Sequence, residues 1–134
     1  MTRKVSIAGS MFVFDHDWPD GSESQSFNFQ NTVFVGSEAP LDLLRKEGCV
    51  DNEVRAELHL TVKLASDEGI MIDGQLKLYE GASCSTNDLD GQTTVAFFVP
   101  KDQVRSFSLR LQNTDEGGDF IDLTMTVKNT AVAP

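Results

Sequence analysis

Apolar and polar residues alternate along much of the chain, and this period of two predicts β-strands. The longest regular stretch runs from Val54 to Leu64, where every even-numbered residue is apolar and every odd-numbered residue is polar or charged. Such alternation is typical of a strand that buries one face. The pattern returns from Ile70 to Glu80, and the five residues between the two stretches predict a hairpin loop.

The apolar faces of these two stretches predict how they pair. If the numbers of paired residues sum to 134, apolar residues face each other on one side, and one pair of opposite charges forms on the other. The pairs include Leu58 with Leu76, Val62 with Ile72, and Glu57 with Lys77. A shift of one residue would turn the apolar face of one strand to solvent. In this register Gly74 falls opposite Leu60, which indicates a bulge or close packing.

The C-terminal half predicts two more hairpins. Residues 93–99 and 103–112 are joined by a short turn, and residues 103–112 and 119–129 are joined by a loop rich in Asp and Gly. In the second of these hairpins, a register sum of 232 places Phe107 opposite Met125. Both hairpins are therefore expected to add strands to an antiparallel sheet.

The N-terminal region predicts strands whose pairing stays open. Residues 5–14 and 27–35 are rich in apolar and aromatic side chains, but more than one register suits them. Gly9 interrupts the first segment, so this segment forms either one strand or two shorter ones.

One segment favours a helix. Pro40 suits a first helical turn and Gly48 suits a helix stop, so at most one short helix is expected near 40–47. With it, the seven or eight predicted strands indicate an all-β fold, an antiparallel β-sandwich. A length of 134 residues fits one domain, residues 1–134.

The amino-acid composition and the net charge exclude some classes of function. The chain has 11 Lys and Arg against 21 Asp and Glu, which gives a formal net charge of −10 with His neutral. Nucleic acid is an unsuitable partner, because phosphate binding requires a basic face. No apolar run is long enough for a membrane span, and no apolar segment of a signal peptide follows Arg3 and Lys4. We therefore expect either a cytoplasmic protein or one secreted without a visible leader.

The two cysteines lie just beyond the best-defined hairpin. The numbers of Cys49 and Cys84 sum to 133, one less than the register of that hairpin, so an extension of the ladder brings them close together. A disulfide and a pair of buried free thiols both fit this position, and the cellular compartment decides between them.

The single indole, Trp18, lies in a loop between acidic residues. A Trp in such a position generally covers the end of the core and hydrogen-bonds through its N–H group. The alternative is that Trp18 forms a ligand platform by stacking on a ring of the ligand.

Acidic residues gather in the predicted loops. Alternate connections of antiparallel strands lie at the same end of a sandwich, which places loops 15–26, 65–69 and 100–102 at one end and loops 36–53, 81–92 and 113–118 at the other. The second end is expected to gather Asn87, Asp88, Asp90, Asp115, Glu116 and Asp119, with Asp51 as an added carboxylate. The first end is expected to gather Asp15, Asp17, Asp20, Asp67 and Glu68.

The simplest interpretation of these loops is that they are solvated turns, because Asp, Asn and Gly are common turn residues. The alternative is a Ca²⁺ site, since clustered carboxylates repel each other and Ca²⁺ binds six to eight oxygen ligands from flexible loops. We therefore predict a non-catalytic module that binds a protein or small ligand through its acidic end loops, with Ca²⁺ as the candidate cofactor. The alternative function is a structural subunit of a larger assembly, including a homo-oligomer.

No enzyme motif is present in the chain. It contains neither a Gly-rich phosphate loop after a strand nor a nucleophile elbow, so we predict that the protein is not an enzyme. A hydrolase that uses two carboxylates is the one catalytic alternative left open, because acidic pairs are plentiful.

Overall fold

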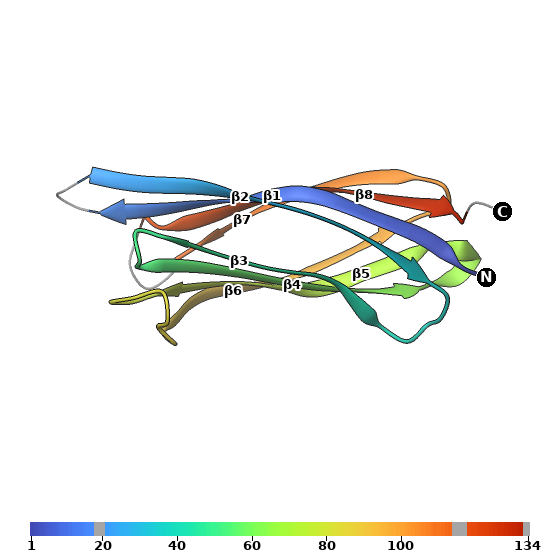
Figure 1. Ribbon diagram of the computed structural model, residues 1–134, viewed down its shortest axis with the longest axis horizontal. Coiled ribbons are helices and arrows are strands. Elements are labelled where there is room, and N and C mark those ends of the chain that lie inside the picture. Colours follow the sequence, from blue (N-terminus) through green and yellow to red (C-terminus); the bar gives the residue numbers. More distant parts are fainter. Residues whose placement is uncertain (18–20, 114–117, 133–134) are drawn as a thin grey trace.

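The computed structural model describes residues 1–17, 21–113 and 118–132, and within them the chain folds into two four-stranded antiparallel sheets. Sheet A has the strand order β2-β1-β8-β7 and sheet B the order β3-β4-β5-β6 (Figure 1). The strands are β1 (Arg3–Asp17), β2 (Gly21–Val35), β3 (Leu41–Val50), β4 (Val54–Leu64), β5 (Ile70–Glu80), β6 (Leu89–Val99), β7 (Val104–Gln112) and β8 (Phe120–Ala131). The prediction of an all-β sandwich is confirmed.

The core lies between the inner faces of the two sheets. In β4 the even-numbered residues from Val54 to Val62 are buried, while the odd-numbered residues between them are partly exposed. Strands β1, β5 and β8 bury alternate residues in the same way. Full burial of one such aliphatic side chain stabilises the fold by about 1.5–3 kcal/mol. The alternation of the sequence is thus the direct cause of the two-layer architecture.

The predicted registers of two hairpins are confirmed. Strands β4 and β5 pair with residue numbers that sum to 134, so Leu58 faces Leu76. Strands β7 and β8 pair with a sum of 232, so Phe107 faces Met125. Gly74 keeps this register without a bulge, and a Cβ atom there would overlap the backbone carbonyl oxygen of His59. Close packing therefore explains this glycine.

The N-terminal strands form one long hairpin. Strands β1 and β2 pair over their whole length with residue numbers that sum to 38, so Met11 faces Phe27. Gly9 does not divide β1. A Cβ atom at Gly9 would overlap the carbonyl oxygen of Thr124 on the neighbouring strand β8, so the glycine permits a close approach of the two strands.

The predicted helix near 40–47 is wrong, because this segment lies in strand β3 and pairs with β4. A register shift between Asp42 and Leu44 leaves Leu43 as an extra residue, and both Leu43 and Leu44 are buried. This bulge breaks the period of two and produces a leucine spacing that imitates a helix. A helix of two turns is marginal on its own, whereas the strand gains the hydrogen bonds of the ladder.

The predicted hairpin of residues 93–99 with 103–112 is also wrong. Strand β6 pairs with β5 in sheet B, and β7 pairs with β8 in sheet A, so the turn between them crosses from one sheet to the other. The amide of Gln103 donates to the carbonyl of Pro100 at 3.2 Å, which closes the turn. A short turn between two amphipathic strands suits a crossing between stacked sheets as well as a hairpin, so the sequence pattern could not separate them.

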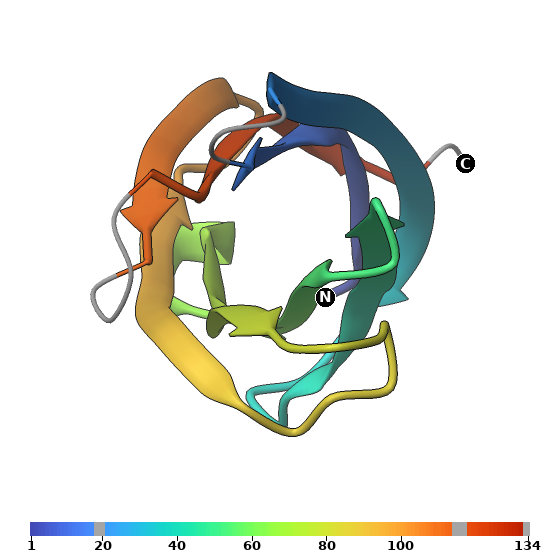
Figure 2. The ribbon, with the colours of Figure 1, turned by 90° about the vertical axis from the view of Figure 1, so that its left-hand side faces the viewer.

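The two sheets curve toward each other at both sides, as the end-on view shows (Figure 2). On one side, the Asn31 side-chain amide of β2 donates to the carbonyl of Leu43 in β3 at 2.6 Å. On the other side, the rings of Phe97 in β6 and Phe107 in β7 stack with centroids 5.0 Å apart. Strands from different sheets are therefore linked along both open sides of the sandwich.

The extra strand β3 changes which loops share an end. The connections β1–β2, β3–β4, β5–β6 and β7–β8 lie at one end, which we call the acidic end. The connections β2–β3, β4–β5 and β6–β7 lie at the other end with residues 1–2, and we call it the Arg3 end (Figure 1). The sequence-based sorting counted one strand too few before Val54, so it placed Asp15 at the same end as Asp67, which is wrong.

Candidate functional site

Three carboxylates come together at the acidic end. Asp15, Asp51 and Glu53 each offer a carboxylate oxygen, and these oxygens all lie within 4.8 Å of one another. Asp15 is near the end of β1 and is 1% exposed, whereas Asp51 is exposed and Glu53 is half-buried. We call these three residues the carboxylate cluster. It combines one carboxylate from the interior with two from the turn between β3 and β4.

The tight turn between β3 and β4 supplies two members of the carboxylate cluster. The amide of Glu53 donates to the carbonyl of Val50 at 3.1 Å, which closes the turn. Asp51 and Asn52 both have a φ of 54°, in the left-handed region that short polar side chains tolerate better than others. The residue types of the turn therefore suit its backbone, and the turn brings Asp51 and Glu53 next to Asp15.

A disulfide fixes this turn from outside. Cys49 and Cys84 are bonded, with a Cα–Cα distance of 6.0 Å, which confirms their predicted proximity and shows which of the two open alternatives holds. The backbone amide of Gly81 donates to the carbonyl of Glu53 at 3.1 Å, and the amide of Cys84 donates to the side chain of Asn52 at 3.2 Å. One covalent bond and two hydrogen bonds thus tie the turn to the loop between β5 and β6.

More polar groups are buried at the same end. Asp90 is 7% exposed and Asp119 is 3% exposed. The carboxylate of Asp119 accepts from the backbone amide of His16 at 2.8 Å and from the side-chain amide of Asn113 at 3.4 Å. Asn113 also donates to the carboxylate of Glu80 at 2.6 Å. Hydrogen bonds of this kind hold the carboxylates in place.

One predicted set consists of Asn87, Asp88, Asp90, Asp115, Glu116 and Asp119. Those of its members that the structure describes lie at the acidic end. Asp90 and Asp119 are buried there, and Asn87 and Asp88 are exposed in the loop before β6. Asp51, the added candidate, belongs to the carboxylate cluster. Asp115 and Glu116 lie outside the described residues.

The other predicted set consists of Asp15, Asp17, Asp20, Asp67 and Glu68. Those of its members that the structure describes divide between the two ends. Asp15 belongs to the carboxylate cluster, and Asp17 ends β1 beside it in the chain. Asp67 and Glu68 lie in a single turn of 3-10 helix, η1 (Ser66–Glu68), at the Arg3 end, so the structure does not bring them to Asp15. Asp20 and Trp18 lie outside the described residues.

Sequence reasoning missed Glu53. It treated residues 36–53 as one connection and selected only Asp51 from it. The available signal was the Val50–Val54 segment, where polar residues separate two apolar ones and indicate a tight turn between strands.

The Arg3 end contains a different arrangement. Arg3 is 2% exposed, and its guanidinium donates to the side chains of Asn129 at 2.8 Å, Glu68 at 3.3 Å and Asp102. The ammonium of Lys101 lies 2.8 Å from the other oxygen of Glu68, and it lowers the pKa of Glu68 most strongly, with Arg3 adding to the effect. Side chains of the chain itself thus compensate the carboxylates here, which indicates a structural role.

The comparisons with known proteins give no information on the function. No helix among the described residues combines the length and apolar character that a membrane crossing requires. No protein-family model matches the chain, and no curated protein matches its sequence.

Proposed function

We propose that the protein is a binding module whose carboxylate cluster holds a hard divalent cation, Ca²⁺, at the acidic end. The observation that carries this proposal is the placement of carboxylate oxygens from Asp15, Asp51 and Glu53 within 4.8 Å of one another. Oxygens bind Ca²⁺ at about 2.3–2.6 Å, so two ligands on opposite sides of the ion lie roughly 5 Å apart. The cluster therefore has the dimensions of one bound ion.

The ligand chemistry favours Ca²⁺ over other metals. All three groups are carboxylates, and hard oxygen ligands suit Ca²⁺ and Mg²⁺ better than zinc or copper. Mg²⁺ requires near-octahedral geometry, whereas Ca²⁺ accepts irregular sites with water and carbonyl oxygens as further ligands. The exposure of Asp51 leaves room for such waters and for an oxygen of a bound partner.

An ion in this position would link several strands of the fold. Asp15 belongs to β1 in sheet A, while Asp51 and Glu53 lie in the turn of sheet B. A cation between them would join the two sheets at the acidic end and offer an open coordination position to a protein or small ligand. The expectations that the protein is not an enzyme, and that assembly is the alternative function, stay predictions; light scattering across concentrations tests the second.

Thermal unfolding with and without Ca²⁺ tests the proposal. A ligand that binds only the folded state stabilises it by about 2.7 kcal/mol at a concentration of 100 times its dissociation constant. We expect the melting temperature of the wild type to rise with Ca²⁺ and that of Asp51→Asn to rise much less. Asp88→Asn removes an exposed carboxylate at the same end, outside the cluster, and should respond like the wild type. An unchanged melting temperature of the wild type at roughly 10 mM Ca²⁺, above the usual range of extracellular sites, would contradict the proposal.

A further inference from the structure

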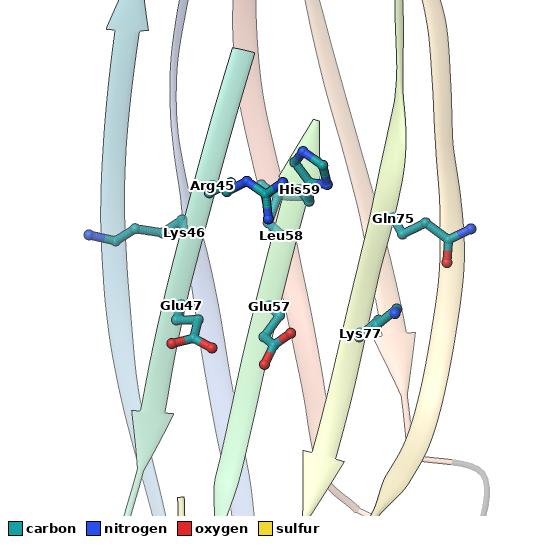
Figure 3. A pocket seen from close by; sticks show the side chains of 8 residues that line it. All are labelled: Arg45, Lys46, Glu47, Glu57, Leu58, His59, Gln75 and Lys77. Carbon is teal, nitrogen blue, oxygen red and sulfur yellow. The ribbon is translucent and has the colours of Figure 1, made fainter. Parts of the chain in front are cut away.

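A groove of about 520 Å³ lies on the outer face of sheet B, across β3, β4 and β5 (Figure 3). Most of the polar and charged side chains that line the groove form two rows that run across the strands. The register defines these rows as Arg45, His59 and Gln75, and then Glu47, Glu57 and Lys77. Neighbouring rows on one face are two residues apart along each strand, which is roughly 7 Å.

The first row is suited to a carboxylate. It combines the guanidinium of Arg45, the imidazole of His59 and the amide of Gln75, and Figure 3 shows Arg45 and His59 close together. The carboxylate of Asp42 already lies against this row, 2.9 Å from Nε2 of His59 and 3.9 Å from Nε of Arg45. Arg45 nevertheless keeps 69% of its side chain exposed, so it is accessible to a second carboxylate.

The second row is suited to an ammonium group. Glu47 and Glu57 are direct cross-strand neighbours, and their carboxyl groups lie side by side (Figure 3). Like charges in directly opposite positions destabilise a sheet. A hydrogen bond to Glu57, together with burial and repulsion, raises the pKa of Glu47. Arg55 approaches from one side, with Nε 2.7 Å from Glu57 and 3.9 Å from Glu47. The ammonium group of a ligand bound in the groove would relieve the repulsion that remains between these two carboxylates.

The charges of the groove fit a dipolar ligand better than a simple ion. The lining carries charges of both signs, with Arg45, Lys46 and Lys77 positive and Glu47 and Glu57 negative. An extended chain advances roughly 3.5 Å per residue, so the termini of a dipeptide lie about 7 Å apart. This length matches the spacing of the two rows.

We propose that this groove binds the zwitterion of a dipeptide, with its carboxylate on Arg45 and its ammonium on Glu47 and Glu57. Gln75 lies beside the first row and offers its amide to the peptide group of the ligand. The site is separate from the carboxylate cluster, and binding there does not depend on Ca²⁺.

Titration with glycylglycine, followed by the backbone amide resonances of the isotope-labelled protein, tests the proposal. We expect saturable shifts around residues 45, 47, 57 and 59, with a dissociation constant on the order of 1 mM. N-acetyl-glycylglycine lacks the ammonium and glycylglycinamide lacks the carboxylate, so each should bind at least about tenfold more weakly. Absence of saturable shifts at roughly 20 mM glycylglycine, or equal binding of the blocked peptides, overturns the proposal.

Matched variants locate the two contacts. Glu47→Gln should weaken glycylglycine binding severalfold and leave the melting temperature unchanged or slightly higher, because it removes a like-charge pair. Asp73→Asn changes another carboxylate of the same outer face, beyond the groove, and should bind like the wild type. Arg45→Gln should also weaken binding severalfold, with Arg105→Gln on β7 as its control. Equal binding by Glu47→Gln, Arg45→Gln and their controls overturns the assignment.

Discussion

The acidic residues at the two ends of the sandwich have different neighbours. At the Arg3 end, the buried guanidinium of Arg3 lies between the carboxylates of Glu68 and Asp102. At the acidic end, the carboxylates of Asp15, Asp51 and Glu53 are gathered within 4.8 Å of one another. The Arg3 end therefore contains its cation as part of the chain, while at the acidic end we propose that a cation binds from solution.

The difference follows from which strand positions carry charge. Arg3 begins β1 and points inward, so its side chain fills the mouth of the sandwich and reaches both the η1 turn and the β6–β7 turn. Asp15, twelve residues later on the same strand, has the same inward parity and is buried at the opposite mouth. One strand thus carries opposite charges to the two ends of the core.

Removing the disulfide should have the largest effect on stability. Cys49 and Cys84 are 35 residues apart, and loss of this cross-link should lower the free energy of unfolding by about 3–4 kcal/mol through the entropy of the unfolded chain. Urea denaturation of the Cys49→Ser, Cys84→Ser double variant measures the loss. Reductant should destabilise the wild type by a similar amount and leave the double variant unaffected. A double variant as stable as the oxidised wild type would contradict this prediction.

Arg3→Met should have the next largest effect. It removes the buried cation and leaves the side chain of Asn129 without one hydrogen-bond donor, while Glu68 keeps its contact with Lys101. Because Asp102 is largely exposed, we expect a loss of about 2–3 kcal/mol rather than the full value of a buried pair. Urea denaturation measures this loss. Arg105→Met, at an exposed position, should change the stability by less than about 0.5 kcal/mol, and equal losses would refute the structural role of Arg3.

The pH dependence of stability should show a smaller effect at the Arg3 end. Lys101 and Arg3 lower the pKa of Glu68 below its ordinary value of 4.5, so its contribution is complete above that pH and is lost as the pH falls through the lower folded pKa. The stability difference between wild type and Glu68→Gln should therefore shrink between about pH 5 and pH 3. A difference that stays constant over this range would contradict the prediction. Urea midpoints at each pH provide the measurement.

Regular alternation made part of the fold predictable, and an irregularity in β3 obscured another part. The pairing of β4 with β5 followed from an unbroken apolar face, and the extension of that ladder predicted that Cys49 and Cys84 lie close together. The bulge at Leu43 removed the alternation of β3, and flanking residues Pro40 and Gly48 resembled helix termini. This error also placed Asp15 at the wrong end relative to Asp67, because each strand in the count reverses the end at which the next loop lies.

The smallest expected effect separates two aspartates that are nearly identical in local structure. Asp51 and Asp67 are both exposed, both lie in tight turns, and have φ values of 54° and 56°. They differ in the end of the sandwich on which they lie. Asp67→Asn should change the free energy of unfolding by less than about 0.5 kcal/mol, since Asn tolerates the left-handed backbone, and should leave the response to Ca²⁺ intact. Asp51→Asn should reduce that response. Thermal unfolding with Ca²⁺ compares the two variants directly. If both lost the response equally, nonspecific charge and not the carboxylate cluster would govern the effect of the ion.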